Sequence, residues 1–160
     1  MTTQTRDKIK FEQDADGFLT PHSRQTATEV AFPEQWIANS DNTALTAGAI
    51  GRTCWTSSDL SAYNSLTIEV VAAPTGTTPI LQLYPTVDGT NYAATPLAFL
   101  NLATGAIIAG ATGLNAIGIY AVLSAVGGGL KIRGAKMLLN GGAADVAIAA
   151  SAVRFLSGNV

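Results

Sequence analysis

The stretch Ser65-Leu-Thr-Ile-Glu-Val-Val71 decides the fold class of this 160-residue chain. Its apolar side chains alternate with the polar residues Thr67 and Glu69, which is the period expected of a β-strand with one buried face. Pro74 and Gly76 then end the run, because both residue types favour turns. The side chains predicted to face the core are Leu66, Ile68 and Val70.

A second strand pattern follows along the chain. Ile80-Leu-Gln-Leu-Tyr84 predicts another strand, and Val87-Asp-Gly-Thr-Asn-Tyr92 comes shortly after it. The pair Asp88-Gly89 is typical of a tight turn between two antiparallel strands. We therefore expect a hairpin here, with residues 92–99 as the return strand.

Similar signals recur through the rest of the chain. Further strands are expected at residues 47–56, 116–124, 129–138 and 145–156. About seven or eight short strands at this spacing predict an all-β fold, either a β-sandwich or a jelly roll. An alanine-rich helix around residues 98–109 stays open as an alternative and would not change the fold class.

The N-terminal segment differs from this pattern. Residues 1–43 predict an extended N-terminal arm and residues 44–160 the β-domain, because the apolar residues of the arm follow neither a strand period nor a helical one. The arm either folds back as an irregular edge of its own domain or anchors on a neighbouring subunit. Four large aromatic side chains are the candidates for anchoring: Phe11, Phe18, Phe32 and Trp36.

Charged residues are concentrated in the arm. Residues 1–43 hold 11 of the 20 charged side chains, and residues 44–160 hold nine across 117 positions. The second segment is thus roughly 8% charged, whereas a soluble domain is usually about 25% charged. Surfaces so poor in charge tend to be covered by neighbouring subunits or to carry small polar residues. The composition therefore favours assembly.

Nucleic acids and membranes are not expected as partners. The net charge of −2 and the lack of a basic block give no electrostatic attraction to nucleic acid. The run from Gly89 to Leu130 is uncharged, but polar residues and glycines interrupt it too often for a membrane span of about 20 predominantly apolar residues. No secretory signal is expected, since no apolar run follows the charges of the N-terminus.

The residues needed for metal chemistry are scarce. The single histidine, His22, cannot build a multi-histidine site, and the single cysteine, Cys54, cannot build a cysteine cluster. We interpret Cys54 as a small buried hydrophobic residue beside Trp55. Residues 12–19 copy the start of a calcium loop, but Ser23 stands where a bidentate glutamate belongs.

Catalytic motifs are also lacking. The glycines at 127–129 are not followed by the lysine and hydroxyl of a phosphate loop, and they predict a turn into a strand Leu130-Lys-Ile-Arg133. The carboxylates left for glycoside cleavage are Asp59, Glu69, Asp88 and Asp145. Asp88 is committed to its turn, so this set is thin. We predict that the chain is not an enzyme and has no catalytic, cofactor-binding or metal site.

A family resemblance is carried by the same stretches: Ser65-Leu-Thr-Ile-Glu-Val70, Gly76-Thr-Thr-Pro-Ile-Leu-Gln-Leu-Tyr84 and Val87-Asp-Gly-Thr-Asn-Tyr92. Together they resemble a pattern found in small β-sandwich, jelly-roll-like virion proteins of tailed bacteriophages. Leu130-Lys-Ile-Arg133 is similar to the basic strand near the C-terminus of those proteins. The resemblance covers about half of residues 44–160 and does not include the arm.

The resemblance implies a non-enzymatic structural component of a phage particle, assembled in the host cytoplasm and carried on the virion. Capsid decoration, cement and minor head proteins are the members that it suggests, and trimers are common among them. The implied partners are other copies of the chain and the major capsid protein or another virion protein.

The alternative is a tail, neck or fibre module that binds a receptor or a carbohydrate. Such a module would use exposed aromatic rings, although aromatic residues more often pack in a core. The candidates are Trp55, Tyr63, Tyr84, Tyr92 and Tyr120.

Overall fold

A computed structural model of the chain describes residues 3–6, 9–13, 19–22, 36–123 and 130–159, with side chains from Ser40 onward. The chain divides into two compact units, Met1–Glu34 and Gln35–Val160. This division lies before the boundary at residues 43 and 44 that the charge distribution indicated. The reason is that Trp36–Asp41 forms a strand, β4, within a sheet of the second unit.

The described part of the first unit is a small sheet, whereas an extended arm was expected. β1 (Thr3–Arg6), β2 (Ile9–Gln13) and β3 (Leu19–His22) are antiparallel and lie in the order β1-β2-β3. Pro21 occupies β3 at the edge of this sheet, where the missing proline amide interrupts no central ladder. Strands of four or five residues leave little periodic signal in the sequence.

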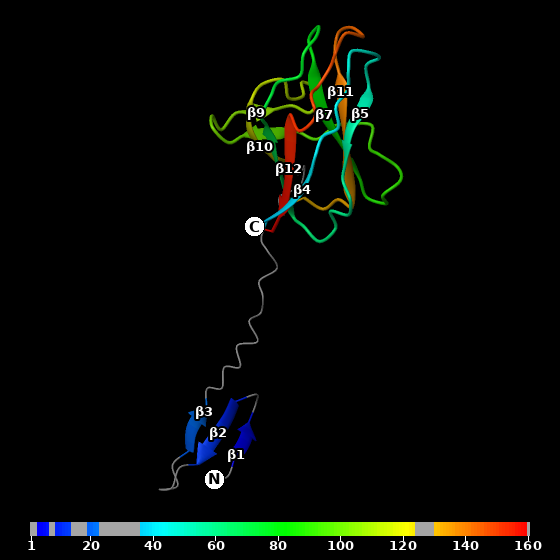
Figure 1. Cartoon of the computed structure of the whole chain (residues 1–160). Helices are drawn as coiled ribbons and strands as arrows, with labels where there is room; N and C mark the ends of the chain where they lie inside the picture. Colours follow the sequence, from blue (N-terminus) through cyan, green and yellow to red (C-terminus); the bar gives the residue numbers. More distant parts are fainter. Residues whose placement is uncertain (1–2, 7–8, 14–18, 23–35, 124–129, 160) are drawn as a thin grey trace. The chain divides into compact units, whose positions relative to one another are not determined.

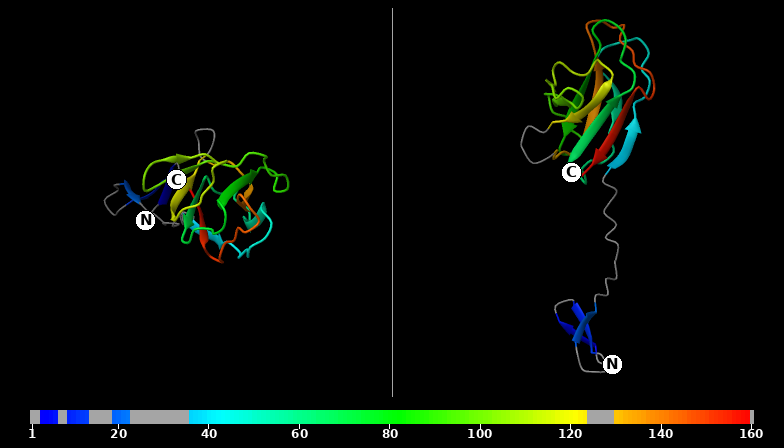
Figure 2. Two further views of the ribbon diagram at one scale, coloured as in Figure 1. Left: turned by 90° about the horizontal axis from the view of Figure 1, so that it is seen from above. Right: turned by 90° about the vertical axis from the view of Figure 1, so that its left-hand side faces the viewer.

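The second unit contains two antiparallel sheets (Figure 1). The larger sheet has the order β4-β12-β6-β10-β8-β9, and the smaller one has the order β5-β11-β7. Figure 2 shows the first strand of the unit, β4, beside the last, β12. The strands after β4 are β5 (Arg52–Thr56), β6 (Ser65–Val70), β7 (Ile80–Thr86), β8 (Phe99–Asn101), β9 (Ile107–Ile108), β10 (Gly118–Val122), β11 (Gly134–Asn140) and β12 (Val153–Gly158).

The alternation predicted for the first quoted stretch is confirmed in β6. Leu66, Ile68 and Val70 are buried, and the residues between them are partly exposed. β6 lies between β12 and β10 near the middle of the larger sheet. One of its faces therefore packs on the core while Glu69, on the other face, reaches solvent and meets Arg154 of β12.

One hydrophobic core takes side chains from both sheets. Ile68, Phe99 and Tyr120 come from the larger sheet, and Leu83 and Met137 come from the smaller one. Trp55 of β5 stacks on Phe155 of β12 with the ring centroids 3.7 Å apart, which joins the two sheets directly. Burial of Cys54, at 1% exposure, agrees with its interpretation as a core residue.

The fold class predicted from the sequence, all-β, is confirmed for the described residues. The second unit has nine described strands against the expected seven or eight, because β4 precedes the predicted domain boundary and β9 is only two residues long. Whether the two sheets form a sandwich or a jelly roll stays a prediction.

The predicted hairpin at Asp88-Gly89 is wrong, although the turn itself is present. Gly89 has a φ of +83°, the left-handed conformation that a glycine adopts without strain. After the turn, however, Tyr92 makes only an isolated bridge to Thr86. The next strand, β8, begins at Phe99 and belongs to the other sheet. Pro96 interrupts the expected return strand.

The other predicted strands are present with shifted bounds. The ranges 47–56, 116–124, 129–138 and 145–156 contain or overlap β5, β10, β11 and β12. Leu130-Lys-Ile-Arg133, predicted as a strand, precedes β11, which begins at Gly134. The turn predicted at residues 127–129 lies outside the described residues. The open alternative of a helix at residues 98–109 is replaced by β8, a turn and β9. Among the described residues, no helix is both long and apolar enough to cross a membrane.

Candidate functional site

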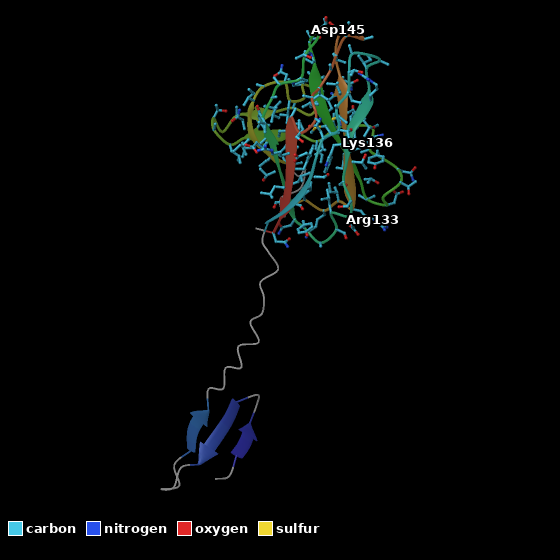
Figure 3. All side chains as sticks on the ribbon, in the orientation of Figure 1. Arg133, Lys136 and Asp145 are labelled. Atoms are coloured by element: carbon cyan, nitrogen blue, oxygen red, sulfur yellow. The ribbon has the colours of Figure 1, made fainter. Side chains whose placement is uncertain are left out.

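Three segments converge at one end of the smaller sheet. β5 and β7 both run antiparallel to β11, so they run in the same direction as each other. Their C-terminal ends therefore lie beside the N-terminal end of β11. The residues that follow β5, those that follow β7 and the residue that precedes β11 meet there. Figure 3 shows Arg133 at this end and Asp145 at the opposite end.

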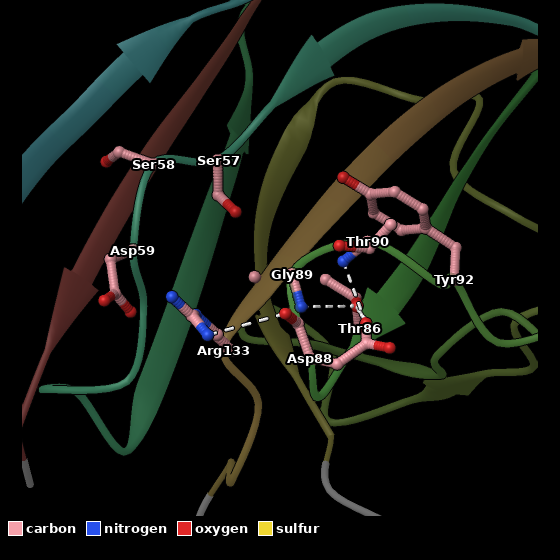
Figure 4. Close-up of a pocket in the computed structure, with 10 residues that line it drawn as sticks. Ser57, Ser58, Asp59, Thr86, Asp88, Gly89, Thr90, Tyr92 and Arg133 are labelled. Atoms are coloured by element: carbon pink, nitrogen blue, oxygen red, sulfur yellow. Dashed lines mark hydrogen bonds between the residues drawn. The ribbon is translucent and has the colours of Figure 1, made fainter.

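A cavity of about 320 Å³ lies among these segments (Figure 4). Its volume is at the lower end of the range for small-molecule sites, roughly 300–1,000 Å³. Figure 4 places Arg133 between the segment that follows β5 and the segment that follows β7. The lining residues are Ser57, Ser58, Asp59, Thr86, Asp88, Gly89, Thr90, Tyr92, Arg133 and Gly134.

Asp88 organises one wall of this cavity. Its Oδ1 accepts hydrogen bonds from the amides of Thr90 and Asn91, both at 2.8 Å, and from the Thr86 hydroxyl at 2.9 Å. Its Oδ2 accepts a bond from the Asn91 side-chain amide at 2.7 Å. The backbone bonds from Thr90 and Asn91, followed by the side-chain bonds, hold the pKa of Asp88 far below its usual range. The interpretation of Asp88 as a turn residue is confirmed.

Backbone bonds fix the other two segments. The Ser57 Oγ accepts a bond from the Ala135 amide at 2.7 Å, and the Leu60 amide donates to the Arg133 carbonyl at 2.7 Å. The Arg133 amide in turn donates to the Thr86 carbonyl at 2.9 Å. The positions of the three walls are therefore set by the fold itself.

Asp59 and Arg133 carry the charges that remain available in the cavity. Asp59 accepts a bond from the Ser61 amide at 2.8 Å, and the hydroxyl and amide of Ser61 lower the pKa of Asp59, with a smaller contribution from Arg133. The Arg133 Nη1 donates a long bond, 3.5 Å, to the Asp88 carbonyl. In the described part of the chain, the one salt bridge links Glu69 and Arg154, so the charges of Asp59 and Arg133 are not paired directly.

An aromatic ring completes the wall. Tyr92 is partly exposed, and the Lys136 ammonium lies 4.4 Å from the centre of its ring. Of the other aromatic candidates, Trp55 and Tyr120 are buried in the core, while Tyr63 and Tyr84 are partly exposed away from the cavity lining. The structure therefore places one of the five candidate rings in this cavity.

The four candidate carboxylates are not brought together. Asp59 and Asp88 line the cavity, Glu69 pairs with Arg154 at 3.4 Å, and Asp145 accepts bonds from Thr77 at the other end of the smaller sheet. Those Thr77 bonds, backbone first, lower the pKa of Asp145. Among the described residues, no group of three metal-binding side chains occurs.

A second feature is an apolar patch on the outer face of the larger sheet, formed by Leu102, Ile107, Ile117 and Ile119. Tyr120 points into the core, so Ile119 points outward, and Leu102 follows β8 at the level of Ile119. Ile107 of β9 pairs with Leu100, whose neighbour Phe99 is buried. The exposed fractions of the four side chains run from 47% to 71%.

Sequence reasoning found some of these residues and missed others. The Asp88-Gly89 turn and Tyr92 were visible as local patterns, whereas Ser57 belongs to no motif and Arg133 was predicted only as the end of a basic strand. They reach the cavity only because β5, β7 and β11 align. Phe18 and Phe32 lie outside the described residues, and Phe11 lies in β2 with its side chain outside the described part. Trp36 begins β4 and pairs through its backbone with Gly158.

Comparison with known proteins gives a similarity to a solved structure. No family model and no curated protein matches the sequence. A solved structure, that of the SPBc2 prophage-derived protein YomS, aligns with a TM-score of 0.47 and 12% sequence identity. The alignment covers 76% of this chain and 91% of that chain.

Proposed function

We propose that this chain is a non-enzymatic structural component of a phage particle. In this proposal it is a capsid-associated decoration, cement or minor head protein, carried on the virion, whose two sheets form a sandwich. The resemblance of residues 65–92 to small virion proteins of tailed phages supports the class. The apolar patch supports the mode of action, which is contact between subunits.

The patch favours a second copy of the same chain as the occupant. The run from Gly89 to Leu130 contains every residue of the patch and no charged residue. Two copies can therefore bring the same surface together, as a twofold interface requires, with Glu69 of β6, which lies beside Ile119 and pairs with Arg154, at the border of the contact. The four side chains expose on the order of 300–400 Å² of apolar surface, which is within the size of the largest patch on a monomer, a patch that is often functional. The uncharged loops around them supply further area toward the roughly 800 Å² per partner of a stable interface.

The test is the mass of the protein in solution. Sedimentation velocity of the full chain between about 10 and 100 µM should show reversible association, since this range corresponds to the weaker specific complexes. Replacing Ile107 and Ile117 together (Ile107→Lys with Ile117→Lys) should give a monomer, because each ammonium buried in the uncharged contact would lack a partner. A wild-type chain that stays monomeric at about 100 µM contradicts the proposal.

A matched control separates the patch from general surface hydrophobicity. Val87 is 78% exposed and lies outside the patch. Val87→Lys should leave association unchanged. Equal loss of association in Val87→Lys and in the patch variant would count against the patch as the contact surface. Urea unfolding of each variant shows whether the fold is retained.

We further propose that residues before β4 attach the chain to the major capsid protein or another virion protein. The arm aromatics Phe11, Phe18 and Phe32 are the proposed anchors, with Trp36 at the start of the domain. Full-length Phe11→Ser with Phe18→Ser should co-sediment less with the particle while the domain unfolds at the same urea concentration. Unchanged co-sedimentation would remove these two aromatics as anchors.

A further inference from the structure

The cavity at the end of β5, β7 and β11 has no part in the proposed assembly, so it requires its own explanation. It lies at the end of the smaller sheet, and none of its lining residues belongs to the apolar patch. Its walls are held by the backbone bonds of Leu60, Arg133 and Ala135 and by the Asp88 turn. A cavity with walls fixed in this way is pre-organised to bind a small ligand without a large ordering cost.

The groups in the cavity that are still able to bind a ligand have mixed character. Arg133 offers donors, because the one bond described for its guanidinium group is the long contact from Nη1 to the Asp88 carbonyl. Asp59 offers a carboxylate, with its Oδ1 already accepting the Ser61 amide. The Ser58 and Thr90 hydroxyls can both donate and accept. Asp88 contributes little, since both of its oxygens already accept hydrogen bonds.

The charges exclude two ligand classes. An anion would meet the two carboxylates of Asp59 and Asp88 with one guanidinium group to offset them. A metal cation would find one carboxylate with remaining capacity, Asp59, which already accepts hydrogen bonds from Ser61 and interacts with the positive Arg133. A neutral ligand with neighbouring hydroxyls suits both groups, because one hydroxyl can accept from Arg133 while the next donates to Asp59.

We propose that this cavity binds a neutral carbohydrate. Arg133 and Asp59 hydrogen-bond adjacent hydroxyls of one sugar ring, the Ser58 and Thr90 hydroxyls bind others, and Tyr92 provides an aromatic surface for the carbon–hydrogen face of the ring. The ammonium of Lys136 holds the Tyr92 ring from one side. The site is independent of the proposed association between copies and would operate on a monomer as well.

The test is an NMR titration of the ¹⁵N-labelled full chain with glucose, galactose, mannose and N-acetylglucosamine, each added to about 50 mM, since a small open site binds in the millimolar range. At least one sugar should give saturable shifts at the amides of Ser58, Thr90 and Ala135. Absence of saturable shifts with all four sugars overturns the proposal. Binding of glucuronate with no binding of the neutral sugars overturns it equally.

Two variants test the residues. Arg133→Met and the isosteric Asp59→Asn should each weaken binding at least about tenfold, because each removes a charge-assisted hydrogen bond. Asp59→Asn keeps the oxygen that accepts the Ser61 amide, so its turn should persist. Lys131→Met removes an exposed charge outside the cavity and should leave the affinity unchanged. Equal affinity in the wild type, Asp59→Asn and Arg133→Met would show that the sugar binds elsewhere.

Discussion

The two halves of the larger sheet differ in how their surfaces are stabilised. In the half formed by β4, β12 and β6, Glu69 and Arg154 pair on the outer face, and the buried Asn42 joins the segment after β4 to β12. In the half formed by β10, β8 and β9, the same outer face carries the apolar patch. The first half thus has an ion pair and a buried amide and exposes Val71 after β6, whereas the other half exposes a four-residue apolar patch for which the chain provides no cover among its described residues.

The difference shows where the low charge of the sequence matters. The nine charged residues among residues 44–160 are not spread evenly along the sequence. The ion pair of Glu69 and Arg154 lies on the outer face of the half formed by β4, β12 and β6. The strands of the other half, β10, β8 and β9, come from the uncharged run from Gly89 to Leu130. The charge density is therefore lowest in one half of the sheet, and assembly is proposed for that half.

The largest expected effect concerns Asn42, whose side chain is 3% exposed. Its Oδ1 accepts the Val153 amide and its Nδ2 donates to the Ala149 carbonyl, both at 2.8 Å. Asn42→Ala should lower the free energy of unfolding by about 3 kcal/mol, because it leaves the buried Val153 amide without its partner and removes the bond to the Ala149 carbonyl. The exposed Asn115→Ala in the other half should change it by less than about 0.5 kcal/mol. Urea unfolding measures both, and equal losses would contradict the comparison.

Hydrogen exchange should separate the two halves next. The Asn101 amide donates to the Ala106 carbonyl within the short β8–β9 pair at the edge of the sheet, and the Val71 amide donates to Ala152 beside β6 and β12. At low protein concentration, the Asn101 amide should exchange about 100-fold faster than the Val71 amide, because short edge strands open locally. At high concentration, a bound second copy should reduce this difference. Equal rates in dilute solution would show that the halves open together.

The thiol of Cys54 reports on opening near β4 and β5. Desolvation by burial raises the pKa of Cys54 to about 12, so the folded protein has almost no thiolate. An aromatic disulfide reagent should therefore label Cys54 only after opening. Asn42→Ala should raise the labelling rate at least about tenfold, and Ile107→Lys should leave it unchanged. Fast labelling of the wild-type fold would contradict the burial of this thiol.

The smallest effect is expected for the ion pair on the outer face. Arg154 and Glu69 are 55% and 45% exposed, and their nitrogen and oxygen are 3.4 Å apart. Glu69→Gln should lower the free energy of unfolding by no more than about 0.5 kcal/mol, since water and salt screen such pairs. A loss above about 1 kcal/mol in urea unfolding would mean that the charged half depends on this pair more than the comparison allows.

Features that depend on neighbouring residues could be predicted from the sequence, whereas features that depend on distant residues could not. The alternation of β6 and the Asp88-Gly89 turn depend on neighbouring residues, and both are present. The predicted return strand after Tyr92 is wrong because the chain makes only an isolated bridge there and then passes to the larger sheet, where β8 begins at Phe99. The boundary at residues 43 and 44 missed β4 for the same reason, since β4 is held by β12 at the far end of the chain.

The sequence by itself determined the all-β class, the buried face of β6, the turn at Asp88 and the scarcity of charge after residue 43, because these follow from composition and from periods within a few residues. Only the tertiary structure decided which strands became neighbours. It brought Asp59, Asp88 and Arg133 to one cavity and placed Leu102, Ile107 and Ile119 on one face. These groupings depend on long-range strand pairing, in which residues tens of positions apart become neighbours, and no local pattern records such pairing.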